Sequence, residues 1–143
     1  MPHKLAVGNF KGVDVAFKAD DLLEYFTIDR PYKVPQVGES YGWIQNLRGR
    51  IVTHIAWWQV IRQWNLNLFR FTAADEVALT ASALLYSVDK TYIGIPVDEI
   101  QIIETVDDDQ LVSIGETVGE GECPLSWQGR IIIDPKTIFQ HVA

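Results

Sequence analysis

Two stretches of the chain repeat one pattern: Val15–Leu22 reads VAFKADDL, and Ile93–Ile100 reads IGIPVDEI. Each has apolar, small and apolar residues, then two variable positions, two acids and an aliphatic residue, at an offset of 78 positions. A second matched pair, Gly49–Val52 and Gly129–Ile132, follows in the same order at an offset of 80. Matched blocks in one order indicate a duplicated unit of roughly 80 residues. Two copies are too few for a solenoid, which needs about three.

Most of the predicted elements are strands, because short apolar or β-branched runs alternate with turn residues. We predict turns at Gly8–Gly12, at Gly49, at Asp89-Lys90 and at Asp107–Asp109. The predicted strands are Leu5–Val7, Val13–Phe17, Leu22–Ile28, Tyr41–Leu47, Ile51–Ile55, Thr91–Val97, Ile100–Val106, Leu111–Ile114 and Ile131–Ile133. The long apolar stretch Val77–Val88 precedes the Asp89-Lys90 turn and is expected to form the hairpin with Thr91–Val97.

Two short helices are predicted, one in each half of the chain. In the second, Asp134 is a good N-cap and Pro135 suits the first helical position. In the first, apolar residues recur at i, i+3, i+4 and i+7, namely Trp57, Val60, Ile61 and Trp64.

The sequence therefore predicts a mainly all-β fold of two small, related antiparallel barrels, SH3-like or OB-like, with short helices. The approximate repeat halves are residues 5–70 and 77–142, together forming a single domain. Whether each barrel comes from one repeat, or the repeats exchange strands, is left open by the sequence.

Composition sets the broad class of protein. With 48% hydrophobic and 22% charged residues, the 143-residue chain has the composition of a soluble globular domain, not of a disordered one. The single Cys123 excludes an internal disulfide and a multi-cysteine zinc site. No run reaches the ~18 to 20 apolar residues of a membrane helix, and no signal-peptide core follows Met1. We expect a cytoplasmic protein without membrane insertion.

The charge pattern disfavours nucleic acid and divides the chain. A net charge of −7 argues against polyanion partners. No acid occurs from Ser40 through Ala74, whereas Thr91 through Gly129 holds nine acids and no Lys or Arg. Two interpretations remain open: two solvated faces that differ in charge, or a basic and an acidic lobe that favour head-to-tail contacts.

No catalytic, cofactor or metal site is predicted. The three histidines His3, His54 and His141 are scattered, without the spacing of a metal site. Asp20-Asp21 and Asp107–Asp109 lack the glycine and glutamate frame of a calcium loop. We therefore predict that the protein is not an enzyme.

The segment Gly42–Val52, GWIQNLRGRIV, resembles the signature of CheW-like chemotaxis coupling domains, Gly-x-x-x-Asn-Leu-Arg-Gly-x-Ile-Val. Three further segments resemble other parts of that family, in the right order, so that the resemblance spans Leu5 to Val142. They are Val13–Phe17 with Leu22–Glu24, which resembles the opening hairpin and next strand, then Tyr92–Ile100, and Gly129–Ile138, which resembles the closing strand and helix.

The resemblance implies two small barrels and a non-catalytic adaptor without a cofactor. Such domains couple the cytoplasmic tip of a chemoreceptor to a CheA-like histidine kinase, in arrays at the membrane. They use a groove between the lobes for the receptor, and lobe edges for the kinase's regulatory domain. Where the family usually continues Ile-Val-Pro-x-Ile-Asp-Leu, this chain has Ile51–Trp57, IVTHIAW. The missing proline and aspartate indicate a divergent member, for example of a pilus-type or twitching chemosensory system.

Four residues are candidates for partner binding: Arg48, Glu24, Asn46 and Trp58. The resemblance places Arg48 at the receptor groove and Asn46 in the same motif, although Arg48 could instead stabilise the turn. Glu24 lies on the matching strand, or is an ordinary solvated carboxylate. Trp57 falls on the apolar helical face and is predicted to be buried. Trp58 lies off that face and is predicted to be exposed, as a partner contact.

Two other functions were weighed against the adaptor. Small barrels with exposed aromatic residues commonly bind single-stranded nucleic acid, and only the acid-free stretch supports this here. The second alternative to the adaptor is a small-molecule binding module with a tryptophan-lined cleft.

Overall fold

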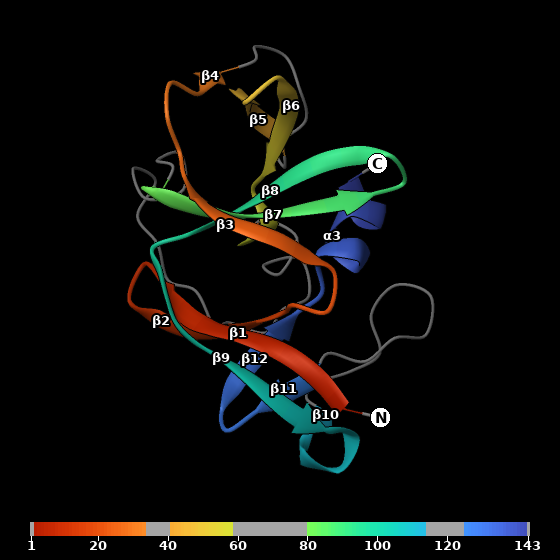
Figure 1. Ribbon diagram of the computed structural model, residues 1–143. Helices are drawn as coiled ribbons and strands as arrows, with labels where there is room; N and C mark the ends of the chain where they lie inside the picture. Colours follow the sequence, from red (N-terminus) through yellow and green to blue (C-terminus); the bar gives the residue numbers. More distant parts are fainter. Residues whose placement is uncertain (1, 34–40, 59–79, 114–124, 143) are drawn as a thin grey trace.

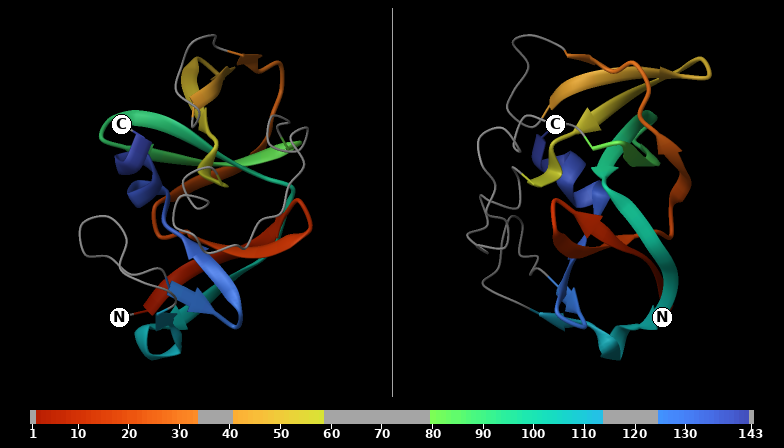
Figure 2. Two further views of the ribbon diagram at one scale, coloured as in Figure 1. Left: turned by 180° about the vertical axis from the view of Figure 1, so that it is seen from behind. Right: turned by 90° about the vertical axis from the view of Figure 1, so that its left-hand side faces the viewer.

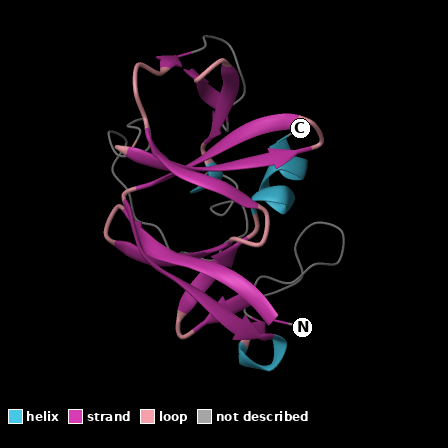
Figure 3. Ribbon diagram, in the orientation of Figure 1, coloured by secondary structure: helices cyan, strands magenta, loops and turns pink. Residues whose placement is uncertain are grey.

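The computed structural model describes residues 2–33, 41–58, 80–113 and 125–142. Strands dominate the described residues, and they form two sheets stacked one above the other (Figures 1 and 3). The strands are β1 (Pro2–Phe10), β2 (Val13–Lys18), β3 (Leu22–Thr27), β4 (Tyr32–Lys33), β5 (Tyr41–Leu47), β6 (Arg50–Ile55), β7 (Ser82–Val88), β8 (Thr91–Val97), β9 (Glu99–Asp107), β10 (Val112–Ser113), β11 (Leu125–Trp127) and β12 (Arg130–Ile133). The helical elements are the 3-10 turn η1 (Asp108–Gln110) and α3 (Pro135–Val142).

The two sheets have the same strand order. Barrel A has the order β10-β11-β12-β2-β1-β9, and barrel B has the order β4-β5-β6-β8-β7-β3. In each barrel one contact is parallel, β12 with β2 and β6 with β8, and the others are antiparallel. The predicted mainly β fold of two related barrels is confirmed.

The strands of the two barrels come from different parts of the chain. Barrel B is built from consecutive strands between Leu22 and Val97, whereas barrel A combines β1 and β2 with β9 to β12. In Figure 1 the red strands near the N-terminus therefore lie beside teal and blue strands. Each sheet thus combines the first hairpin of one repeat with the later strands of the other repeat. Barrel A joins β1–β2 to strands β9 through β12, and barrel B joins β7–β8 to strands β3 through β6.

In the described ranges, four two-residue turns close the main hairpins. Both residues of each turn have positive φ, which is the type I′ geometry that matches the twist of paired strands. The turns are Lys11-Gly12, Arg48-Gly49, Asp89-Lys90 and Gln128-Gly129, with φ between 49° and 86°. The predicted turns at Gly49 and Asp89-Lys90 are confirmed, and the equivalent turns of the two barrels lie at the predicted offsets of 78 and 80.

The predicted turn Gly8–Gly12 is too long, because Gly8 lies inside β1. Gly8 faces a bulge of β9, and a Cβ atom there would lie 2.2 Å from the backbone oxygen of Glu99. The glycine is therefore required by the close approach of two strands and not by a turn.

Within the described residues, three apolar clusters stabilise the fold. One fills the interior of barrel A around Leu5 and Trp127, and one fills barrel B around Phe26 and Leu85. The largest lies between the barrels and includes residues from both sheets and Ile138 of α3. Burial of this shared cluster makes the two barrels one structural unit.

Trp57 and Trp58 lie in the cluster between the barrels, and both are fully buried. The predicted burial of Trp57 is confirmed, and the predicted exposure of Trp58 is wrong. Phe10 contacts both rings, with centroids 4.7 Å from Trp57 and 4.8 Å from Trp58. The prediction from helical periodicity holds for a helix that packs along one face only. Here Trp57 and Trp58 lie in a helical turn between the two barrels, so both side chains are covered. The rest of that predicted helix lies outside the described residues.

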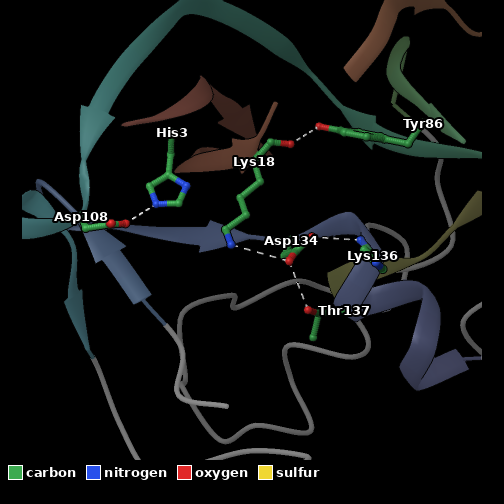
Figure 4. A network of polar contacts seen from close by, with 7 residues as sticks. All are labelled: His3, Lys18, Tyr86, Asp108, Asp134, Lys136 and Thr137. Carbon is green, nitrogen blue, oxygen red and sulfur yellow. Dashed lines mark hydrogen bonds and ion pairs between the residues drawn. The ribbon is translucent and has the colours of Figure 1, made fainter. Parts of the chain in front are cut away.

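A polar network ties barrel A, barrel B and α3 together (Figure 4). Asp134 caps α3, because its carboxylate accepts hydrogen bonds from the Lys136 backbone at 3.1 Å and the Thr137 hydroxyl at 3.3 Å. Lys18 at the end of β2 lies 3.8 Å from the same carboxylate. The Tyr86 hydroxyl of β7 donates to the Lys18 carbonyl at 2.7 Å. The N-cap predicted at Asp134 is confirmed.

Candidate partner-binding site

The candidate site is an ion pair between the tip of one hairpin and an edge strand of barrel B. Arg48 lies in the β5–β6 turn, and its Nη2 donates to Oε1 of Glu24 on β3. The side chains are 64% and 31% exposed, so that a partner can reach the guanidinium while the carboxylate is partly covered. An exposed pair of this kind contributes at most about 1 kcal/mol to stability. Two residues that the sequence analysis chose separately are therefore brought into contact.

The turn places Arg48 in an unfavourable backbone conformation. Its φ is +52°, in the left-handed region that costs a non-glycine residue roughly 1 to 2 kcal/mol. Asn46 offsets part of this cost, because its Oδ1 accepts the Gly49 backbone N–H at 2.8 Å. The side chain of Asn46 thus holds the turn that presents Arg48.

Exposed apolar side chains flank the ion pair along the chain. On β3, Leu23 and Tyr25 on either side of Glu24 are 52% and 46% exposed. On β6, Ile51 is 58% exposed, and the Arg50 guanidinium lies 5.1 Å from the centre of the Tyr92 ring. A charged centre with exposed aromatic and aliphatic neighbours has the composition of a protein-binding surface.

Trp58, the fourth candidate for partner binding, does not lie on the surface with the Arg48–Glu24 ion pair. Trp58 is buried in the cluster between the barrels, so that partner contact through its ring is not available in this structure. Its Nε1 is buried and makes no hydrogen bond within the described part of the chain.

From His54 onward, the segment that departs from the family pattern is buried. Trp57 donates a hydrogen bond from Nε1 to the Pro96 carbonyl at 2.8 Å. His54 is buried in barrel B, with Nε2 3.1 Å from Oε1 of Gln45, and Nδ1 has no hydrogen-bond partner among the residues that the structure describes. Burial lowers the pKa of His54 from 6.5 to about 4. This polar pair could not be predicted from the sequence, because no spacing rule links a lone histidine to a glutamine nine positions earlier.

A cleft of about 360 Å³ opens where the polar network joins the barrels. Its lining is strongly charged: Lys18, Asp20, Asp21, Asp89, Asp134 and Lys136. Burial, together with Asp134, Asp21 and Asp20, raises the pKa of Tyr86, which also lines the cleft. Within the described ranges, no three His, Cys, Asp or Glu side chains group as metal ligands. No helix in those ranges has the length and apolarity needed to span a membrane.

The geometry defines a two-lobed chain of paired six-stranded barrels with a surface ion pair on one of them. Among solved structures it is similar to the scaffolding protein TtCheW from Thermoanaerobacter tengcongensis, with a TM-score of 0.64. The match covers 94% of this chain and 84% of that chain, at 17% sequence identity. The fold is therefore CheW-like.

Comparisons by sequence give no further relatives. No protein-family model matches the chain, and no curated protein matches it.

Proposed function

We propose that this protein is a non-catalytic adaptor that couples a chemoreceptor to a CheA-type histidine kinase in a chemosensory array. The observation that carries the proposal is the Arg48–Glu24 pair on a CheW-like fold. Arg48 is exposed, held in a costly conformation, and flanked by exposed apolar residues. The other three type I′ turns also begin with a residue other than glycine, so the backbone conformation alone does not single out Arg48. Its exposed guanidinium and its exposed apolar neighbours support a role for the side chain in binding.

In this proposal Arg48 and Glu24 contact the cytoplasmic tip of the receptor, and Asn46 positions Arg48. The barrel surfaces bind the kinase's regulatory domain. Localisation is cytoplasmic, with recruitment to receptor arrays at the membrane. The departures at Ile51–Trp57 support a divergent role, such as service in a pilus-type or twitching system. No cofactor is required, because binding alone produces the output.

Charge provides a second supporting argument. The described acids between Asp98 and Asp109 all lie on or beside barrel A, whereas Arg48 and Arg50 lie on barrel B. If the kinase's domain has two similar lobes, unlike lobes would attract and form head-to-tail contacts. Salt should weaken such assembly, since the charges are exposed.

The test is co-sedimentation with receptor-containing membranes and the CheA-type kinase of the same genome. The variant Arg48→Glu should reduce recruitment to the receptor by at least about tenfold, because it places like charges together at the contact. Arg30→Glu is the matched control, since Arg30 is also an exposed arginine with a φ of +51° in barrel B. Equal recruitment of the Arg48→Glu variant and the control would refute a receptor contact at this site.

A charge swap separates contact from fold. The double variant Arg48→Glu/Glu24→Arg can restore an ion pair of reversed polarity. Recovered stability with lost recruitment would support direct contact by Arg48. Full recovery of recruitment would mean that the pair acts only through the fold.

A further inference from the structure

We propose that strand β9, the open edge of barrel A, binds an extended, basic segment of a partner protein by strand addition. This inference concerns the other barrel and does not rest on the function of Arg48. Among the strands that the structure describes, β9 pairs only with β1, so its outer backbone groups face no neighbouring strand. Figure 2 shows β9, in teal, running along the outside of the molecule.

Strand β3 is the edge strand of barrel B that corresponds to β9, and the two edges differ in how they are covered. Both edge strands carry a bulge at the same place, Leu23 on β3 and Gln101 on β9, which are 78 positions apart. The next residue is Glu24 in barrel B and Ile102 in barrel A. Arg48 from the hairpin tip pairs with Glu24 across its edge, but the equivalent turn of barrel A has Gln128. Among the described residues, the β9 edge therefore has no ion pair equivalent to Arg48–Glu24.

Two exposed isoleucines on β9 favour a partner strand that extends the sheet over a domain that docks on one of its faces. Ile102 and Ile103 are 51% and 54% exposed. Consecutive strand residues face opposite sides of a sheet. In the register, Ile102 lies beside Val7 of the barrel A cluster, and Ile103 lies beside Ala6 of the cluster between the barrels. A domain docked on one face could cover only one isoleucine. A strand added at the edge would pack beside both.

The negative charge of the β9 edge favours a basic partner segment. Glu99, Glu104 and Asp107 lie along β9, and none forms an ion pair within the described part of the chain. Lys4 of β1, which faces Thr105, is the cation nearest in the register. Antiparallel pairing of two β9 edges would gather six carboxylates on one sheet, which disfavours a second copy of this chain. A partner strand with Lys or Arg flanking β-branched or aromatic residues meets both the charge and the apolar centre.

The open run is short and defined. The bulge at Gln101 interrupts the ladder, so that regular pairing extends from Ile102 to Asp107. A segment of about five or six residues suffices to cover it, because each residue of a strand spans about 3.3 Å.

The test selects ligands from a phage-displayed library of random nonapeptides on the wild-type protein. We expect enrichment of peptides with β-branched or aromatic centres and basic flanks. Synthetic copies should bind the variant Ile102→Lys/Ile103→Lys at least about tenfold more weakly, because edge lysines block strand addition. Val112→Lys is the matched control, since Val112 is a similarly exposed apolar residue on β10, away from β9 in the strand order of barrel A. On binding, amide exchange should slow between Ile102 and Val106.

Three outcomes would overturn the proposal: no enriched peptide, enriched peptides with acidic flanks, or equal binding to the double variant and the control. Sedimentation of the wild-type protein alone gives an independent result. Dimers that the Ile102→Lys/Ile103→Lys change dissociates would assign the edge to a second copy instead. Should that variant be unfolded by circular dichroism, Glu99→Gln/Glu104→Gln replaces it and should weaken peptide binding several-fold.

Discussion

Acid should destabilise this protein through one buried side chain, His54. In barrel A the parallel pairing sets Ile132 beside Ala16, and in barrel B it sets His54 beside Gly94. Since Nε2 of His54 faces Oε1 of Gln45, Nδ1 is the basic nitrogen, and no described residue forms a hydrogen bond with it. Protonation would bury a charge in an apolar cluster, which is why the folded-state pKa is about 4.

The sign of the pH dependence follows from linkage. The pKa of His54 falls from 6.5, the ordinary value expected for the unfolded chain, to about 4 in the folded protein. Between these values the unfolded chain binds more protons, so stability is lost as pH falls through this window. At about 1.4 kcal/mol per pKa unit, the total loss is about 3 kcal/mol. Roughly 2 kcal/mol of it should appear between about pH 7 and about pH 4.5.

The assay is urea unfolding at both pH values, comparing the wild-type protein with His54→Ile/Gln45→Leu. The two changes replace the buried polar pair with aliphatic side chains; at the offset of 80, Leu125 is the equivalent of Gln45 and packs against the apolar cluster of barrel A. The double variant should lose about 2 kcal/mol less than the wild type on acidification. Gln45→Leu alone is the control, because it keeps the histidine and should stay acid-sensitive. Equal losses in the wild type and the double variant would refute the reasoning.

Three further changes follow from single contacts. Gly94→Ala should destabilise the protein by about 1 to 3 kcal/mol, because its Cβ would lie 2.5 Å from His54 Nδ1; thermal unfolding in a His54→Val background should show a smaller cost. Trp57→Phe should cost about 1 to 3 kcal/mol in urea unfolding, because the buried Pro96 carbonyl loses its donor; a cost near zero would contradict the hydrogen bond. Arg48→Gly should leave urea stability unchanged or raised by up to about 1 kcal/mol, since glycine removes the positive-φ cost, while receptor recruitment falls; an unchanged recruitment would contradict the proposed contact.

The architecture could be predicted because the repeat carries its own signals. Turn residues such as Gly49 and Gly129 mark equivalent hairpins, and Asp134-Pro135 marks the start of α3. These signals act over a few residues, so that a single sequence contains them. Strands such as Tyr41–Leu47 and Thr91–Val97 have the predicted bounds for the same reason.

The site could be predicted only in part, because its geometry depends on long-range packing. Arg48 and Glu24 were both candidates, yet no periodicity relates residues on a turn and a distant strand. Trp58 was misplaced because helical periodicity describes one packed face and not a position between two barrels. The exposure of Ile102 could not be predicted either. A short apolar run is typical of a buried strand, and only the strand order shows that β9 lies at an edge.

The arrangement of strands sets an order of events during synthesis. All strands of barrel B have left the ribosome once Val97 has emerged, whereas β1 and β2 must wait for β9 to β12. Leu5, for example, pairs with Glu104, far later in the chain. We expect the nascent chain to fold barrel B first, while the apolar β1–β2 hairpin still lacks its partner strands β9 and β12. A pause in translation before Ile133 would prolong this vulnerable state and favour capture by chaperones.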